Sequence, residues 1–66
     1  MRNRIESVVN AISEFPRKEI THEELEALII DKADVLYRNS IKDYVIALLA
    51  KGIITPKDEI NYLIKV

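Results

Sequence analysis

Residues 37–55 constrain the fold most, because they predict a helix that stops sharply and continues as a strand. Asn39 or Ser40 is a suitable cap for the start of this helix. Gly52, the only glycine of the chain, predicts its end, and the β-branched residues that follow predict a strand. The apolar residues that share one stripe of the predicted helix are Ile41, Tyr44, Val45, Leu48 and Leu49.

Residues 1–14 predict a first amphipathic helix. Asn3 is a candidate cap, and Glu6 stands three residues later, where a capping box places an acid. Pro16 predicts the end, because the residue before a proline disfavours the helical conformation. The apolar stripe of this helix consists of Ile5, Val8, Val9 and Ile12.

The second helix is predicted to begin at Thr21, after a short extended segment at residues 17–20. Thr21 is a suitable cap, and Glu24 can bond back to it. Residues 31–36 allow two interpretations: they form a loop, or Asp34 caps an early start of the third helix. The stripe of the second helix consists of Leu25, Leu28 and Ile29.

The C-terminal third of the chain predicts a β-hairpin. Pro56 fits the second position of a type I turn at residues 55–58, and residues 60–66 alternate as a strand does. Ile60, Tyr62, Ile64 and Val66 fall on one face, and Asn61, Leu63 and Lys65 on the other. The predicted core consists of Ile5, Val8, Ile12, Leu25, Leu28, Ile41, Tyr44, Val45, Leu48 and Ile54.

The chain has 66 residues, which is room for a single domain, residues 1–66, with a small core. Self-association would bury additional apolar surface, so we expect a homodimer. The expected contact is either the first helix beside Val9 and Ala11, or an open edge of the last strand near Leu63. Abundant isoleucine with no glutamine or cysteine is compatible with a thermophilic source.

Composition argues against several classes of function. The only histidine, His22, has no partners at metal-ligand spacing, and the helix dipole accounts for acids such as Glu23 and Glu24. The chain lacks a Gly-rich phosphate loop and a nucleophile motif, so we expect neither an enzyme nor a cofactor or small-molecule ligand. It also lacks a signal peptide and a membrane-spanning run, which predicts a cytoplasmic protein.

The predicted order of helix, extended link, two helices and hairpin resembles the winged helix-turn-helix DNA-binding family. Residues 20–25, 40–45 and 48–54 carry the resemblance, above all the Lys-Gly helix end followed by an aliphatic strand. Size and composition are similar to those of small winged-helix proteins of thermophilic archaea and their viruses or plasmids. The resemblance implies an α+β fold that is mostly α, with three helices and a C-terminal hairpin wing. It also implies a transcriptional regulator that binds double-stranded DNA.

In that family the third helix enters the major groove and the hairpin contacts the neighbouring backbone. Carried over, the resemblance places a DNA contact surface on the side of the third helix opposite its apolar stripe. Asp43 would have to accept from a cytosine amino group or repel the backbone. The implied DNA-binding residues are Arg38, Asn39, Ser40, Lys42, Asp43 and Ile46, with Lys57 at the tip of the wing.

A net charge of −1 counts against nucleic-acid binding unless the charges segregate, and bases do gather in the second half of the chain. The alternative is a winged-helix protein–protein interaction module that does not bind DNA. Its contacts would be the apolar residues Ile46, Leu36 and Leu63.

Overall fold

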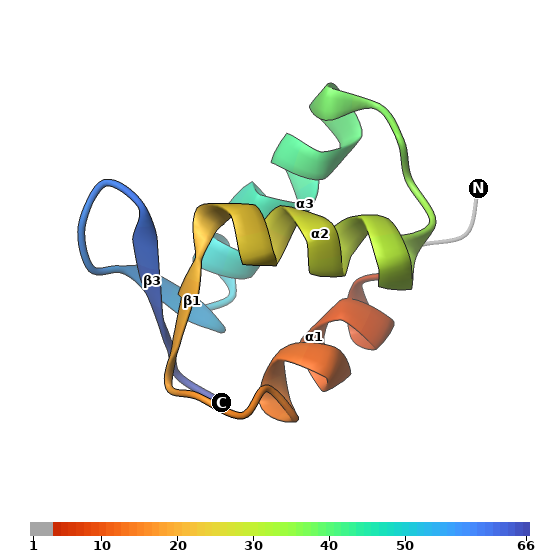
Figure 1. Ribbon diagram of the computed structural model, residues 1–66. Coiled ribbons are helices and arrows are strands. Elements are labelled where there is room, and N and C mark those ends of the chain that lie inside the picture. The colour runs from red at the N-terminus through yellow and green to blue at the C-terminus, as the bar shows by residue number, and fades with distance from the viewer. Residues whose placement is uncertain (1–3) are drawn as a thin grey trace.

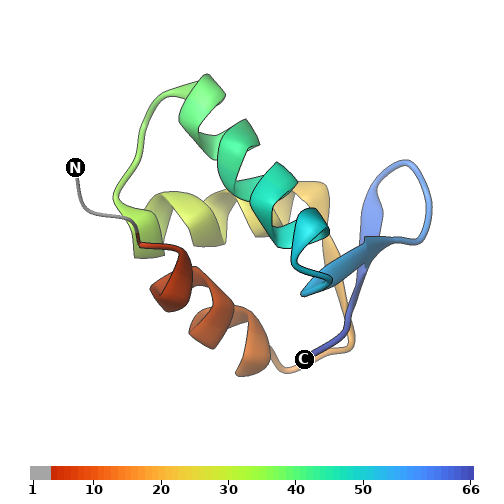
Figure 2. The same ribbon diagram turned by 180° about the vertical axis from the view of Figure 1, so that it is seen from behind.

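The computed structural model describes residues 4–66 as three helices and a three-stranded antiparallel sheet, so the predicted mostly helical α+β class is confirmed (Figure 1). The helices pack around one core, and the hairpin loop projects away from them in both views (Figures 1 and 2). In chain order the elements are α1 (Ile5–Ser13), β1 (Glu19–Thr21), α2 (His22–Ala33), α3 (Arg38–Ala50), β2 (Ile54–Pro56) and β3 (Asn61–Ile64).

The sheet has the strand order β1-β3-β2, with Ile20 opposite Tyr62 and Thr55 opposite Leu63. The predicted hairpin is therefore confirmed as β2 and β3. The extended segment predicted before α2 contributes the additional strand, β1. Because β3 is paired on both sides, the predicted open edge on the last strand is wrong. The free edges belong to β1 and β2, and Pro56 is accommodated because an edge strand needs no N–H there.

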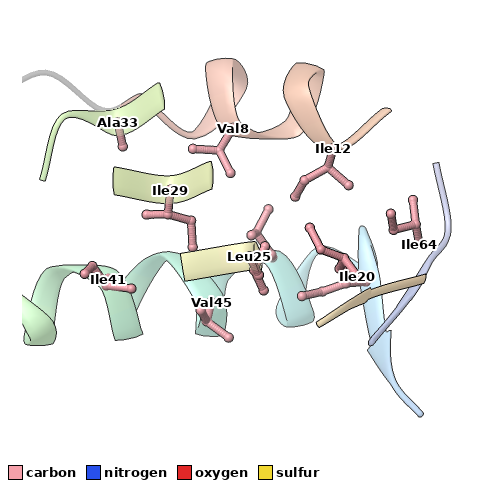
Figure 3. Close-up of a cluster of buried hydrophobic side chains, with 11 residues drawn as sticks. Val8, Ile12, Ile20, Leu25, Ile29, Ala33, Ile41, Val45 and Ile64 are labelled. Atoms are coloured by element: carbon pink, nitrogen blue, oxygen red, sulfur yellow. The ribbon is translucent and has the colours of Figure 1, made fainter. Parts of the chain in front are cut away.

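The core is formed by side chains from all three helices and the sheet. Figure 3 shows Val8 and Ile12 of α1 beside Leu25 and Ile29 of α2, with Ile64 at the end next to the sheet. Seven predicted core residues are buried: Val8, Ile12, Leu25, Ile41, Val45, Leu48 and Ile54. The predicted Ile5, Leu28 and Tyr44 are only half-buried at its margin, whereas Ile20, Ile29, Ala33 and Ile64 complete it.

The first helix ends near its predicted boundary. The N–H of Phe15 donates to the carbonyl of Ile12, and Pro16 follows, as the sequence predicted. The described residue before the helix is Arg4, whose side chain makes no capping bond. The predicted cap Asn3 lies outside the described residues.

The start of α2 is the predicted capping box. The hydroxyl of Thr21 accepts from the N–H of Glu24, and the Glu24 carboxylate accepts from the N–H of Thr21, both at 3.0 Å. The helix ends at Asp34, which adopts the left-handed conformation with φ of 57°. Asp34 therefore ends α2 and does not cap α3, so residues 34–37 are a loop.

The predicted cap of α3 is wrong. The helix begins at Arg38 and its N-cap residue is Tyr37, which makes no side-chain capping bond. Asn39 and Ser40 lie inside the first turn, because the helix starts earlier than the apolar stripe indicated. At the other end Gly52 has φ of 74°, and the N–H of Ile53 donates to the carbonyl of Leu48, the bond of a Schellman motif.

The predicted type I turn at residues 55–58 is also wrong, since Pro56 is still paired with Tyr62 in the sheet. The chain turns at residues 57–60, where the Asp58 carboxylate accepts from the backbone N–H groups of Ile60 and Asn61. Ile60 belongs to this loop and is exposed, and Val66 is exposed beyond β3. Of the predicted inward face, Ile64 is buried and Tyr62 half-buried.

Candidate nucleic-acid interface

The outer face of α3 carries most of the side chains that the family resemblance implied for DNA contact. Its inner stripe of Ile41, Val45 and Leu48 is buried, so the helix has the predicted phase. Ser40 is half-buried. The exposed members of the predicted site on this helix are Arg38, Asn39, Lys42, Asp43 and Ile46.

Apart from Asn39, which lines neither of the two hollows described next, the predicted residues on α3 fall on two flanks of the helix. Arg38, Lys42 and Ile46 face α2 and β3 and line one hollow, of about 400 Å³. Ser40 and Asp43 line a different hollow, on the side of Tyr44 and the α2–α3 loop. The structure therefore separates Lys42 from Asp43, although the two are adjacent in sequence.

We call the first hollow the α2–α3 groove. It lies between the first turns of α2, the outer face of α3 and the middle of β3. It combines cationic, acidic, aromatic and aliphatic side chains, so it can contact both charged and apolar parts of a ligand. Its lining residues are His22, Glu26, Arg38, Lys42, Val45, Ile46 and Tyr62.

His22 connects two walls of this groove. Its Nδ1 lies 3.2 Å from the Tyr62 hydroxyl and its Nε2 lies 3.0 Å from the Glu26 carboxylate. With the proton on Nε2, the ring accepts from the Tyr62 hydroxyl through Nδ1 and presents its N–H side to the Glu26 carboxylate. The imidazole and phenol rings lie 6.0 Å apart between centroids. The arrangement therefore joins the first turn of α2 to the central strand.

This arrangement was not predicted from the sequence. The spacing of His22 and Glu26 by four residues was a usable signal, because such pairs share a helix face. Tyr62 gave no comparable signal, since it lies 40 residues from His22 in the chain. Only the pairing of β1 with β3 brings the two side chains together.

Arg38 and Lys42 are the cations of the groove. They stand one turn apart on the same flank of α3, and neither forms an ion pair with another residue of the described segment, 4–66. Some other cations are paired within residues 4–66, for example Arg17 with Glu24, whereas exposed lysines such as Lys18 and Lys51 form no ion pair there. The two groove cations therefore remain available to an anionic ligand.

Lys57, which the family resemblance implied as a DNA contact at the tip of the wing, is paired within the chain. Its ammonium donates to the Glu19 carboxylate at 2.8 Å, and this hydrogen bond raises the pKa of Lys57 above its ordinary value of 10.5. The loop beyond it carries Asp58 and Glu59. Backbone N–H donation, first from Ile60, holds the pKa of Asp58 below its ordinary 3.8. The tip of the hairpin is thus acidic.

No comparison with known proteins assigns this chain to a family. The sequence matches no protein-family model, and neither the search of curated proteins nor that of solved structures returned a match. Across residues 4–66, no helix is long and apolar enough to cross a membrane. In the same span, no three histidine or acidic residues cluster as a metal site would require.

Proposed function

We propose that this chain is a small winged helix-turn-helix protein that binds double-stranded DNA as an intracellular transcriptional regulator. The element order α1-β1-α2-α3-β2-β3 and the sheet order β1-β3-β2 support this arrangement. In it, α3 enters the major groove and the β2–β3 hairpin lies against the adjacent backbone, with Lys57 towards the phosphates and the acidic Asp58 and Glu59 turned away from them. The winged helix-turn-helix arrangement would then comprise all of residues 4–66.

The observation that carries the proposal is the pair of unpaired cations on the outer flank of α3, Arg38 and Lys42. Cations of this kind neutralise phosphates and release counterions, which is the main sequence-independent source of DNA affinity. Asn39 is exposed one residue further along and suits adenine, while Ile46 suits a thymine methyl group. The net charge of −1 means that attraction to DNA must be local to this flank.

The same proposal includes a homodimer, because one short helix offers few base contacts. Two copies would place their α3 helices on half-sites about one helical turn of DNA apart. The remaining predicted contact surface is α1, where Val9 and Ala11 are half-buried in the single chain. Sedimentation at micromolar concentration tests the dimer, and a 7.6 kDa species at every concentration would exclude it.

The test of DNA binding is a fluorescence titration of a mixed duplex pool at two salt concentrations. Lys42→Ala should weaken binding to all duplexes and lower the slope of log affinity against log salt by about one unit. Lys18→Ala is the matched control, because Lys18 is an exposed lysine just before β1, at the end of that strand away from α2. If neither the parent nor the control binds at low salt, DNA binding is excluded.

A second candidate is the protein–protein interaction module, which the exposed apolar residues favour. Leu36 is 82% exposed, Tyr37 79% and Ile46 52%, whereas the expected contact Leu63 is half-buried. Apolar exposure of this size on a small domain suits a protein contact. The two functions differ in salt dependence, because phosphate contacts weaken steeply with salt and apolar contacts do not.

A further inference from the structure

We propose that Glu26 is a specificity-determining residue of the DNA interface, which lowers affinity for DNA of arbitrary sequence. This inference rests on the proposed function and adds to it a residue that lies outside α3. It concerns the α2–α3 groove, where the Glu26 carboxylate shares the lining with Arg38 and Lys42.

The shared lining is the first argument. Arg38 and Lys42 both line the same hollow, so a phosphate that bridges them is held at the mouth of the groove when their side chains keep these positions. The phosphate then approaches the carboxylate of Glu26 on the facing wall. Like charges that approach each other across a shared hollow repel even in water. The approach of any backbone phosphate is therefore opposed, whatever the base sequence.

The second argument is that Glu26 is held in place. Its carboxylate lies 3.0 Å from His22 Nε2, and His22 is anchored in turn by the Tyr62 hydroxyl at 3.2 Å. The side chain of Glu26 is only 32% exposed. An unrestrained surface acid can rotate away from an incoming phosphate, but this one would first have to give up its contact with His22.

Glu23 shows the contrast within the same helical turn. It is also acidic and lies three residues earlier in α2, yet it is exposed, does not line the groove and makes no ion pair with another described residue. Glu23 is free to turn towards solvent when a phosphate approaches. The chain thus offers one fixed acid and one free acid of identical chemistry.

A fixed carboxylate opposes phosphates but favours an amino donor. The exocyclic amino group of cytosine in the major groove is a donor that a glutamate accepts. A duplex that presents such a donor to Glu26 replaces repulsion by a hydrogen bond, and other duplexes do not. The residue therefore increases the ratio of specific to nonspecific affinity mainly by decreasing the nonspecific part.

The experiment compares Glu26→Gln with Glu23→Gln, because both remove one negative charge from the same region of α2. Glutamine keeps an oxygen that can accept from His22, so the fold should be retained, and Glu26→Ala serves as a second variant. Against a mixed duplex pool at low salt, Glu26→Gln should bind about three- to tenfold tighter than the parent, the effect of removing one close charge. Glu23→Gln should bind less than about twofold tighter.

Two further measurements link the gain to the groove cations and to sequence selection. In the Lys42→Ala background, Glu26→Gln should give a smaller gain, because the phosphate is no longer drawn to that position. Selection from a random duplex library should enrich a sharper motif with the parent than with Glu26→Gln. An equally sharp motif would overturn the specificity role.

The outcomes separate this inference from the proposed function. If the parent binds duplex DNA and Lys42→Ala weakens it, but Glu26→Gln and Glu26→Ala bind no tighter than Glu23→Gln, Glu26 has no such role and the DNA-binding function stands. If no protein of the set binds at low salt, both proposals are wrong.

Discussion

The starts of α2 and α3 differ in what bonds to their first backbone N–H groups. At α2, Thr21 and Glu24 satisfy each other's backbone N–H groups, and Arg17 pairs with the Glu24 carboxylate. At α3, the N-cap residue Tyr37 makes no side-chain bond, and Arg38 is exposed without an ion pair among residues 4–66. Both helices need partners for their first N–H groups, but only α2 has them from its own side chains.

This difference indicates which polar side chains stabilise the fold and which are free to contact a ligand. Side chains at the start of α2 are already bonded within the chain, so their loss should change stability. The side chains at the start of α3 make no capping bond within the chain. This helix is anchored instead by its buried residues Ile41, Val45 and Leu48. On the proposed function, the buried face of α3 contributes to stability and its exposed face to binding, so the residues of one face can be substituted while the other face is kept.

The largest effect should come from removing the anchor of α3. Leu48 is fully buried, so Leu48→Ala should lower the free energy of unfolding by about 2–5 kcal/mol, which is enough to unfold much of a domain this small. Ile46→Ala on the outer face should cost less than about 0.5 kcal/mol. Urea denaturation measures both. Equal effects at the two positions would show that α3 is not held by its inner stripe.

The capping box of α2 should give the next largest effect. Thr21→Ala removes the acceptor for the Glu24 N–H and should cost about 1 kcal/mol. Ser40→Ala tests the corresponding region of α3 and should cost less than about 0.5 kcal/mol, since Ser40 makes no capping bond. Thermal unfolding followed by circular dichroism compares the two. A larger loss at Ser40 would reverse the contrast between the helix starts.

A smaller effect should appear in acid. The backbone N–H of Thr21, with Arg17, holds the pKa of Glu24 below its ordinary value of 4.5. Because the pKa is lower in the folded state, Glu24 contributes stability above pH 4.5 and loses it as the pH falls through the folded value. Glu24→Gln should therefore flatten the acid side of the curve of stability against pH. An unchanged curve would show that the capping carboxylate is not bonded in solution.

The smallest effect is expected at the cations of α3. Arg38→Ala and Lys42→Ala remove exposed side chains without ion pairs among the described residues, so each should change the free energy of unfolding by less than about 0.5 kcal/mol. Urea denaturation of both variants and of the parent measures this change in the free energy of unfolding. A clear loss of stability would assign these side chains to the fold and weaken the case for an anion-binding flank.

Sequence alone determined those features that depend on neighbouring residues. The Thr21–Glu24 capping box, the helix end at Gly52 and the inner stripe of α3 follow from residue types three or four positions apart. The cap of α3 and the hairpin turn were missed by a few residues, because several positions nearby had suitable side chains. Short-range hydrogen bonds and helical periodicity are encoded within one or two turns of chain.

The tertiary structure decided what depends on distant residues. The pairing of β1 with β3 placed the last strand in the middle of the sheet, brought Tyr62 to His22, and thereby formed one wall of the α2–α3 groove. It also placed Glu19 beside Lys57, 38 residues away in the chain, so the expected wing cation is paired. Such contacts arise from packing the whole core, and no local spacing of residue types specifies them.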